Sequence, residues 1–265
     1  MKVLFWNTNK NPNINRVLCE IIAENNISLV VLAEYEGEIC KLSKELAEIG
    51  INMQEYLTVG CDRIKIMGVE LNISPGRQTD YASFQIIDNK DIFCCIHLPS
   101  QIYNNANGMR KVAIDRIVAD VCSTEKEIGT DNTIILGDFN INPYDNDCLN
   151  ADKFHAIPYC KEILKRNKRI IAGEEFEMFY NPMWNFFGDW KKPFGTYYYS
   201  GNNVENAFWN IYDQVIIKPS LSKRFVNSSL KILTECKICS LLNRQGHPNK
   251  KISDHLPITF EILED

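Results

Sequence analysis

Long apolar runs are missing from this sequence. A membrane-spanning helix needs roughly 20 consecutive apolar residues, and no segment approaches that length. The apolar run at residues 3–6 is also too short for the central part of a secretion signal. We therefore expect a protein without a membrane span and, by default, a cytoplasmic location.

An excess of basic residues is missing too. The chain has 29 Lys and Arg residues against 34 Asp and Glu residues, for a net charge of −5 at pH 7. Proteins that bind duplex DNA without sequence preference are usually basic where they meet the phosphates. Long-range electrostatic capture of duplex DNA is therefore disfavoured, while a local basic patch would still suffice to bind nucleic acid.

The ten cysteines lack the arrangement of a disulfide framework or a zinc site. Cys94 and Cys95 are adjacent within an apolar run, which is typical of reduced thiols used as small hydrophobic side chains. Cys236 and Cys239 form a CxxC pair, but a zinc site needs about four ligands and no second pair lies nearby. We expect free thiols and no zinc.

No linker, repeat or change of composition divides the chain, so we expect a single domain over residues 1–265. Short apolar runs predict strands at residues 2–6, 29–33, 64–71, 82–87, 92–98, 133–136, 211–217, 231–233 and 257–262. Helical spacing of apolar residues predicts helices at residues 14–25, 39–49, 109–122 and 158–171. This order favours an α/β fold in which two packed, mixed β-sheets are flanked by helices, as a four-layer sandwich.

Polar residues recur at the ends of the apolar runs, where a rigid sheet commonly positions catalytic groups. They are Asn7, Glu34, His97, Asp138, Asn140, Asp213, Asp254 and His255. Carboxylate and amide oxygens are the ligands that Mg²⁺ prefers, and histidine can donate to a phosphate oxygen or move a proton. The set contains no cysteine, so it favours metal-assisted phosphoryl chemistry over zinc chemistry.

Six segments resemble motifs of the endonuclease/exonuclease/phosphatase superfamily. They are FWNTN at 5–9, VVLAEYEG at 30–37, HLPS at 97–100, GDFN at 137–140, WNIYDQVII at 209–217 and SDHLPI at 253–258. GDFN and SDHLPI are similar to two of the family's defining motifs. All six occur in the family's order and together span nearly the whole chain, which makes the resemblance far more specific than one four-residue match.

The resemblance implies a hydrolase that cleaves phosphate esters with Mg²⁺ as cofactor and Mn²⁺ as a substitute. It implies that Glu34 binds the metal directly and that Asn7 and Asp254 complete the metal and phosphate site. Asp138, helped by Asn140, would orient or deprotonate the attacking water.

The resemblance also implies that His255 binds the scissile phosphate and stabilises its developing charge. Asp213 would hold the ring of His255, and His97 would donate to a phosphate oxygen or assist the leaving group. Four of these residues also have a structural alternative. Asp138 and Asp213 would suit turns, Glu34 a solvated strand end, and His97 the apolar core.

Two departures from the family's pattern are present. Ser28 and Ala33 stand where the family often has Asp and Gln, but neither position is a primary ligand. Residues 209–212 read WNIY, where abasic-site endonucleases usually carry a basic residue shortly before the supporting aspartate. The second departure weakens the interpretation as a repair nuclease in particular.

Candidate substrate contacts lie outside the motifs. Trp184 and Tyr197 belong to an aromatic-rich stretch at residues 181–201 that could stack on bases or simply form core. Arg110 begins a helix after HLPS and is a candidate phosphate contact. The basic residues between 161 and 169 would form a solvated helix face or a nucleic-acid patch. His155 and His247 lie in no motif and are expected at the surface.

The leading expectation is a nuclease that cleaves phosphodiester bonds of flexible or single-stranded nucleic acid, because aromatic residues are more available than a broad basic face. The alternative enzyme is a phosphatase or phosphodiesterase acting on a small phosphorylated molecule or a lipid head group. A binding module that has lost catalysis is disfavoured, because Glu34, Asp138, Asn140 and His255 are all intact.

Overall fold

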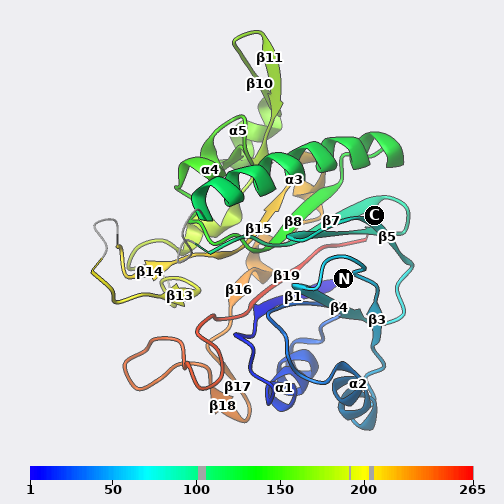
Figure 1. Cartoon of the computed structure of the whole chain (residues 1–265), viewed down its shortest axis with the longest axis vertical. Coiled ribbons are helices and arrows are strands. Elements are labelled where there is room, and N and C mark those ends of the chain that lie inside the picture. Colours follow the sequence, from blue (N-terminus) through cyan, green and yellow to red (C-terminus); the bar gives the residue numbers. More distant parts are fainter. Residues whose placement is uncertain (101–105, 191, 203–205, 265) are drawn as a thin grey trace.

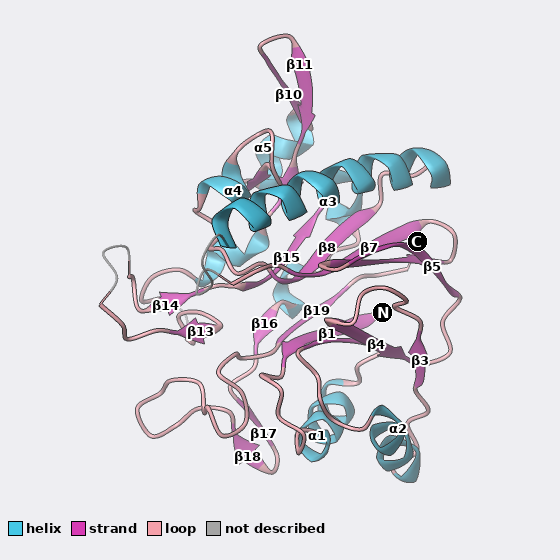
Figure 2. Cartoon of the chain, viewed as in Figure 1, coloured by secondary structure: helices cyan, strands magenta, loops and turns pink. Residues whose placement is uncertain are grey.

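Two β-sheets pack face to face between two layers of helices (Figure 1, Figure 2). This computed structural model describes residues 1–100, 106–190, 192–202 and 206–264. The four-layer α/β sandwich expected from the alternation of strand and helix patterns is therefore confirmed. Within the described residues, no helix is both long enough and apolar enough to cross a membrane.

The first sheet has six strands, and its only parallel pair joins β1 to β2. Its spatial order is β16 (Lys231–Ile232), β19 (Ile258–Glu261), β1 (Lys2–Asn7), β2 (Leu29–Ala33), β4 (Ile64–Gly68) and β3 (Gln54–Tyr56). Helices α1 (Asn15–Asn25) and α2 (Ile39–Glu48) cover its outer face (Figure 1). Because both faces of the sheet are covered at its centre, β2 and residues 3–6 of β1 read as continuous apolar runs.

The second sheet has seven strands, in which β7 and β8 form the central parallel pair. Its order is β5 (Ile73–Thr79), β6 (Ala82–Ile87), β7 (Asp91–His97), β8 (Thr133–Asp138), β15 (Asp213–Ile217), β12 (Phe179–Tyr180) and β9 (Ala156–Ile157). The long helix α3 (Ala106–Ile128) lies across its outer face, with α4 (Asn146–Leu149) and α5 (Cys160–Lys165) beside it (Figure 2).

Alternating side chains of the second sheet serve two hydrophobic clusters. Ile134 and Leu136 of β8 belong to the larger cluster, which fills the space between the sheets, while Ile135 belongs to the smaller cluster under α3. Cys94 and Cys95 of β7 divide in the same way. Successive side chains of a strand point to opposite faces, so both faces are apolar here. All ten cysteines are free thiols.

Three small two-stranded sheets lie outside this sandwich. They are the hairpins β10–β11 (Lys168–Ile171 and Glu174–Glu177), β13–β14 (Tyr197–Tyr198 and Trp209–Asn210) and β17–β18 (Glu235–Cys236 and Cys239–Ser240). Short 3₁₀ helices are found at η1 (Pro182–Phe186), η2 (Pro219–Lys223) and η3 (Asn227–Ser229). The hairpin β13–β14 and the segment that carries β17–β18 lie on the same side of the molecule (left in Figure 1).

The helix expected at residues 158–171 is wrong in its second half. Helix α5 ends at Lys165, and the chain then forms the hairpin β10–β11, which projects beyond the helices (top of Figure 1). Ala172 and Gly173 at its tip have φ angles of 51° and 89°, which suit the tight turn that joins two antiparallel strands. The basic residues between 161 and 169 therefore do not share one helix face.

His155 corrects a second expectation, because it lies in the interior and not at the surface. Its side chain is fully buried, and Nδ1 lies 2.9 Å from the backbone oxygen of Glu177. Burial lowers the pKa of His155 below its usual value, so the ring is neutral at neutral pH. A lone histidine without a motif was expected to be solvated, and only the packing of β9 and β11 around it shows otherwise.

Candidate active site

Three neighbouring strands of the second sheet place ionisable residues side by side. His97 ends β7 and Asp138 ends β8, and the two residues are register partners in that parallel pair. Asp213 begins the antiparallel strand β15 and is the register partner of Asp138 on the other side. The sheet itself therefore brings together three residues that lie far apart in the sequence, because neighbouring strands are only about 4.8 Å apart.

The first sheet contributes Asn7 and Glu34 from the ends of its parallel pair. Asn7 is the last residue of β1, and its Nδ2 donates a 2.9 Å hydrogen bond to Asp138 Oδ2 on the other sheet. Glu34 follows β2 with a φ of 47°, a left-handed conformation that is rare for this residue type. The turn after β1 holds it there, because Thr8 Oγ1 and Lys10 N donate to its backbone oxygen.

Asp138 is almost completely buried, and both of its oxygens accept hydrogen bonds. Oδ2 accepts from Asn7, and Oδ1 accepts from the backbone N–H of Asn140 at 2.9 Å. Gly137 before it has a φ of 152°, and a Cβ there would lie 1.9 Å from the backbone oxygen of Ile96. The glycine of GDFN is thus required by the close approach of β7.

Asn140 is held in place by its own backbone conformation and one long-range contact. Its φ is 50°, which asparagine tolerates better than most residues. Its Nδ2 donates a 2.9 Å hydrogen bond to the backbone oxygen of Leu98, just beyond β7. Asn140 therefore links the end of β8 to the end of β7 and turns its backbone N–H toward Asp138.

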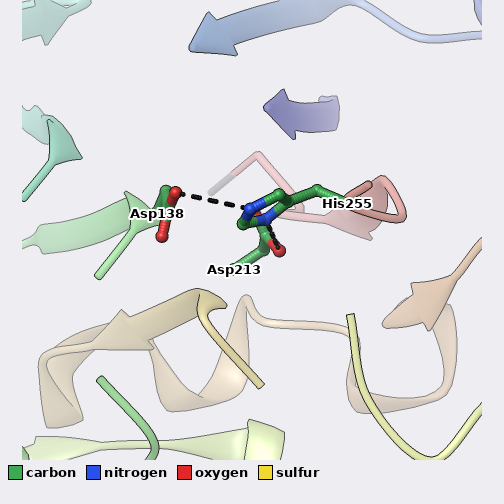
Figure 3. Close-up of side chains that lie close together, drawn as sticks. All are labelled: Asp138, Asp213 and His255. Atoms are coloured by element: carbon green, nitrogen blue, oxygen red, sulfur yellow. Dashed lines mark hydrogen bonds and ion pairs between the residues drawn. The ribbon is translucent and has the colours of Figure 1, made fainter. Parts of the chain in front are cut away.

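His255 and Asp213 form a buried hydrogen-bonded pair (Figure 3). His255 Nδ1 donates to Asp213 Oδ2 at 2.8 Å, and its other nitrogen, Nε2, lies 3.9 Å from Asp138 Oδ2. Burial by itself would lower the pKa of His255, but the carboxylates of Asp213 and Asp138 outweigh it and raise the pKa to about 10. The imidazole is therefore protonated at neutral pH and lies between two carboxylates.

Contacts with β1 of the first sheet position the backbone around His255. Trp6 Nε1 donates to the backbone oxygen of His255 at 2.9 Å. Ser253 Oγ donates to the backbone oxygen of Asn7 at 2.7 Å and accepts from the N–H of His255 at 3.0 Å. The serine of SDHLPI therefore ties the end of β1 to the catalytic histidine candidate, a role that sequence analysis did not assign.

His97 is buried beside two carboxylates without forming a close hydrogen bond to either. Its Nε2 lies 3.4 Å from Glu34 Oε1 and 3.7 Å from Asp138 Oδ2. Burial lowers the pKa of His97, and the nearby carboxylates of Asp138 and Glu34 oppose that shift without reversing it. The two histidines of the site therefore differ in charge at neutral pH, with His97 neutral and His255 protonated.

Arg63 is a charged residue near the site that sequence analysis missed. Its guanidinium lies 4.9 Å from the ring centre of Tyr81, whose backbone oxygen accepts a 3.0 Å hydrogen bond from the N–H of His97. The positive charge of Arg63 also contributes to the lowered pKa of His97. No motif surrounds this arginine, and only the pairing of β6 with β7 brings the Tyr81 contact next to the site.

Asp254 and Tyr197 lie next to the His255 pair. The charge of Asp254 helps to raise the pKa values of both His255 and Tyr197, so its carboxylate lies near both side chains. The Tyr197 ring packs 4.8 Å from the His255 ring and stacks 5.3 Å from the ring of Tyr212. Tyr197 thus covers the catalytic histidine candidate; the sequence left open whether this residue stacks on bases or packs in the core.

The other two candidate substrate contacts, Trp184 and Arg110, contact side chains outside the candidate active site. Trp184 is half-buried in η1 and packs edge-on against Phe187, with ring centres 5.6 Å apart. Arg110 is buried in α3, and its Nε lies 3.6 Å from Asp147 Oδ2. Trp184 is thus engaged in the packing of its own loop, and the contact with Asp147 links the start of α3 to α4.

The donor atoms at this edge fit a hard divalent cation. Glu34 and Asp254 are partly exposed, and their carboxylate oxygens are of the type that Mg²⁺ and Mn²⁺ bind. Asp138, Asp213 and His255 also offer atoms within 4.8 Å of one another. A protonated ring whose Nδ1 donates to Asp213 is a poor ligand, so the oxygens of Glu34, Asp254 and Asn7 suit the ion better.

No protein-family model and no curated protein sequence matches this chain. Solved structures do match it over nearly its full length. An AP endonuclease from Archaeoglobus fulgidus has a TM-score of 0.59 at 14% identity, with 99% of each chain covered. A 3'-5' exonuclease from Neisseria meningitidis has a TM-score of 0.57 at 15% identity, with 100% of each chain covered.

A third structure comes from a phosphatase and not from a nuclease. The mannosyl-6-phosphatase of Bacteroides thetaiotaomicron has a TM-score of 0.56 at 13% identity, with 100% of each chain covered. Identities this low report on the fold and not on the substrate. The two packed sheets, the strand-end site and these similarities together show that the chain has the fold of the endonuclease/exonuclease/phosphatase superfamily.

Proposed function

We propose that this protein is a divalent-metal-dependent hydrolase of phosphate esters and that its substrate is the phosphodiester backbone of nucleic acid. The observation that carries the proposal is the Asp213–His255 pair, whose free ring nitrogen lies 3.9 Å from Asp138 Oδ2. His255, held by Asp213, can donate a hydrogen bond to a phosphate oxygen, and the nearby carboxylate of Asp138 can act as a base.

Asp138 is the general base of the proposed reaction. Asn7 and the N–H of Asn140 fix its two oxygens, so the carboxylate cannot rotate away from an attacking water. A base works only when it lies within hydrogen-bond reach of the proton that it removes. Proton transfer from water to Asp138 would leave a hydroxide ready to attack the phosphorus atom. The bond from phosphorus to the ester oxygen would then break, and the leaving oxygen would take up a proton.

His255 is the electrostatic donor. With its pKa raised to about 10 by the neighbouring carboxylates, the ring carries a positive charge at neutral pH. Its Nε2–H can donate to a non-bridging phosphate oxygen, where negative charge grows in the transition state. Asp213 holds the ring by Nδ1 and keeps Nε2 pointed at that oxygen, as carboxylates do for other catalytic histidines.

His97 and the metal complete the proposed centre. His97 is neutral, so its ring can accept or donate a hydrogen bond at a phosphate oxygen or at the leaving group. Glu34 and Asp254, with Asn7, would hold Mg²⁺ or Mn²⁺, which would neutralise negative charge on the phosphate. These residues are hard oxygen donors, and no cysteine lies among them.

The space beside the site favours nucleic acid over a small phosphate ester. A cavity of about 710 Å³ adjoins Asp254, and its lining includes Tyr198, Lys250 and Lys251. A small phosphomonoester would leave most of that space empty, whereas a nucleic-acid strand continues past the bond that is cut. The similarity to a mannosyl-6-phosphatase keeps a small phosphorylated substrate as the second candidate.

A substrate panel tests the proposal. Single-stranded DNA, duplex DNA, RNA and small phosphomonoesters are each incubated with Mg²⁺ or Mn²⁺ and the wild-type protein. Hydrolysis of at least one phosphodiester is expected, together with its loss in Asp138→Asn and its retention in Asp189→Asn, an exposed control. Hydrolysis of phosphomonoesters alone would favour the second candidate. If no phosphate ester is hydrolysed with either metal, the proposal that this protein is a hydrolase is wrong.

A further inference from the structure

The cavity beside Asp254 is formed by one loop and one hairpin. Seven residues of the loop 243–251, which lies just before SDHLPI, line it on one side, and Tyr198 of β13 and Ser200 beyond it line it on the other. Asp254 is the acidic residue in the lining. Because Asp254 is also a candidate metal ligand, the cavity adjoins the proposed catalytic centre at this residue.

Two adjacent tyrosines of β13, Tyr197 and Tyr198, point to opposite faces of the strand and therefore make different contacts. Tyr197 packs on His255, while Tyr198 lines the cavity. The ring of Tyr198 stacks on that of His247, with centres 3.5 Å apart and planes at 9°. Trp209 packs edge-on against both rings, at 5.4 Å and 5.9 Å. The cavity therefore has an aromatic wall whose orientation is set by three mutually packed side chains.

Asparagine side chains keep the opposing loop ordered. Asn243 Oδ1 accepts hydrogen bonds from the N–H groups of Gln245 and His247, at 2.9 Å and 3.1 Å. Asn249 Oδ1 accepts from the N–H of Lys251 at 3.2 Å. Such side-chain bonds to nearby backbone amides fix turns. The loop thus presents His247 and its lysines in a defined geometry before any ligand arrives, which reduces the entropy cost of binding.

The charges of the cavity differ from those of the whole chain. Lys250 and Lys251 are exposed in its lining, and neither has an ion-pair partner within the described part of the chain. The chain as a whole has a net charge of −5. Two unpaired ammonium groups therefore lie three and four positions before Asp254, where a phosphate next to the scissile one would pass.

We propose that this cavity is a binding subsite for the single strand next to the scissile phosphate. Lys250 and Lys251 contact the adjacent phosphate, and the Tyr198–His247 wall contacts the nucleoside between the two phosphates. The cavity of about 710 Å³ lies within the range of roughly 300–1,000 Å³ that ligand sites usually have. This inference rests on the proposed function, because it names the substrate of that same site and the residues that select it.

The first test is binding without catalysis. Fluorescence anisotropy measures the affinity of a labelled single-stranded oligonucleotide in EDTA at several salt concentrations. The double variant Lys250→Gln/Lys251→Gln is compared with the control Lys44→Gln/Lys231→Gln, two exposed lysines on α2 and β16. We expect weaker binding by about 10-fold and a salt slope reduced by about 0.7, as the loss of one neutralised phosphate on a single strand implies. An unchanged slope would overturn the subsite.

The second test distinguishes the contribution of the aromatic wall from that of the lysines. It also distinguishes a failure of the subsite proposal from a failure of the hydrolase proposal. His247→Ala is expected to raise KM for the oligonucleotide about 10-fold, within the range for one lost stacking contact, without changing the salt slope. Neither His247→Ala nor the double variant Lys250→Gln/Lys251→Gln should change kcat/KM for a small phosphomonoester. Equal losses of kcat/KM on both substrates would contradict the subsite proposal but not the hydrolase proposal. Oligonucleotide binding that depends on these residues, without hydrolysis of any ester, would overturn the hydrolase and leave the subsite.

Discussion

Asn7 at the end of β1 donates a 2.9 Å hydrogen bond to Asp138 at the end of β8, and this bond joins the two sheets. The two residues lie 131 positions apart in the sequence. The same asparagine uses its Oδ1 to accept from the N–H of Asn9 at 3.0 Å, so its amide is held at both ends. Asn7 is therefore placed to orient the proposed base.

Removal of the Asn7 amide should weaken catalysis more than folding. Asn7→Ala leaves Asp138 Oδ2 without its donor, and we expect kcat to fall by about 10- to 100-fold, the range for groups that orient a catalytic or metal-binding residue. Steady-state kinetics and thermal unfolding measure the two effects. Asn13→Ala, an exposed residue of the same loop between β1 and α1, is the matched control and should behave as wild type. A kcat within twofold of wild type in Asn7→Ala would contradict the orienting role.

His255 and Asp213 should act as a unit. His255→Ala should lower kcat by roughly 10²–10⁴-fold, because its ring stabilises charge that appears only in the transition state. Asp213→Asn should reproduce part of that loss, since an amide does not stabilise the protonated ring. The double variant should lose less than the product of the two single losses. If the losses simply multiply, the two residues do not cooperate in catalysis.

Removal of the metal should abolish activity reversibly. EDTA is expected to stop hydrolysis, and Mg²⁺ or Mn²⁺ should restore it, because the proposed ligands are hard oxygens. Glu34→Gln should raise the Mg²⁺ concentration needed for half-maximal activity at least 10-fold, while Glu36→Gln, an exposed neighbour, should not. Metal titrations of the rate measure both variants. Full activity in excess chelator would exclude the proposed mechanism.

Stability should fall as the pH falls below about 6.5 because His155 is buried in its neutral form. Burial lowers its folded-state pKa, so the unfolded chain takes up a proton first and is favoured as the pH decreases. Urea unfolding between about pH 7 and about pH 5 should therefore show a smaller loss of unfolding free energy in His155→Asn than in wild type. Asparagine is chosen because His155 has a φ of 47°. Equal losses in both proteins would show that His155 does not titrate in this way.

The sequence by itself determined the layers of the fold and most of the strand-end residues. Buried strands such as β2 and β8 read as continuous apolar runs because both of their faces are covered, and the polar residue after each run marks the sheet edge. Local sequence patterns predicted secondary structure less well where tertiary packing determines it. The basic segment near Arg169 reads as a helix but forms a hairpin, because a short polar strand carries no apolar period.

Only the tertiary structure decided which side chains meet. Asn7 reaches Asp138 across two sheets, and His97 lies beside Asp138 through a parallel register that no local pattern specifies. The same holds for Tyr197, which covers His255 while its neighbour Tyr198 faces the cavity. The physical reason is that strand pairing and sheet packing bring together residues that lie tens to more than 100 positions apart, and their distances depend on register, twist and side-chain packing.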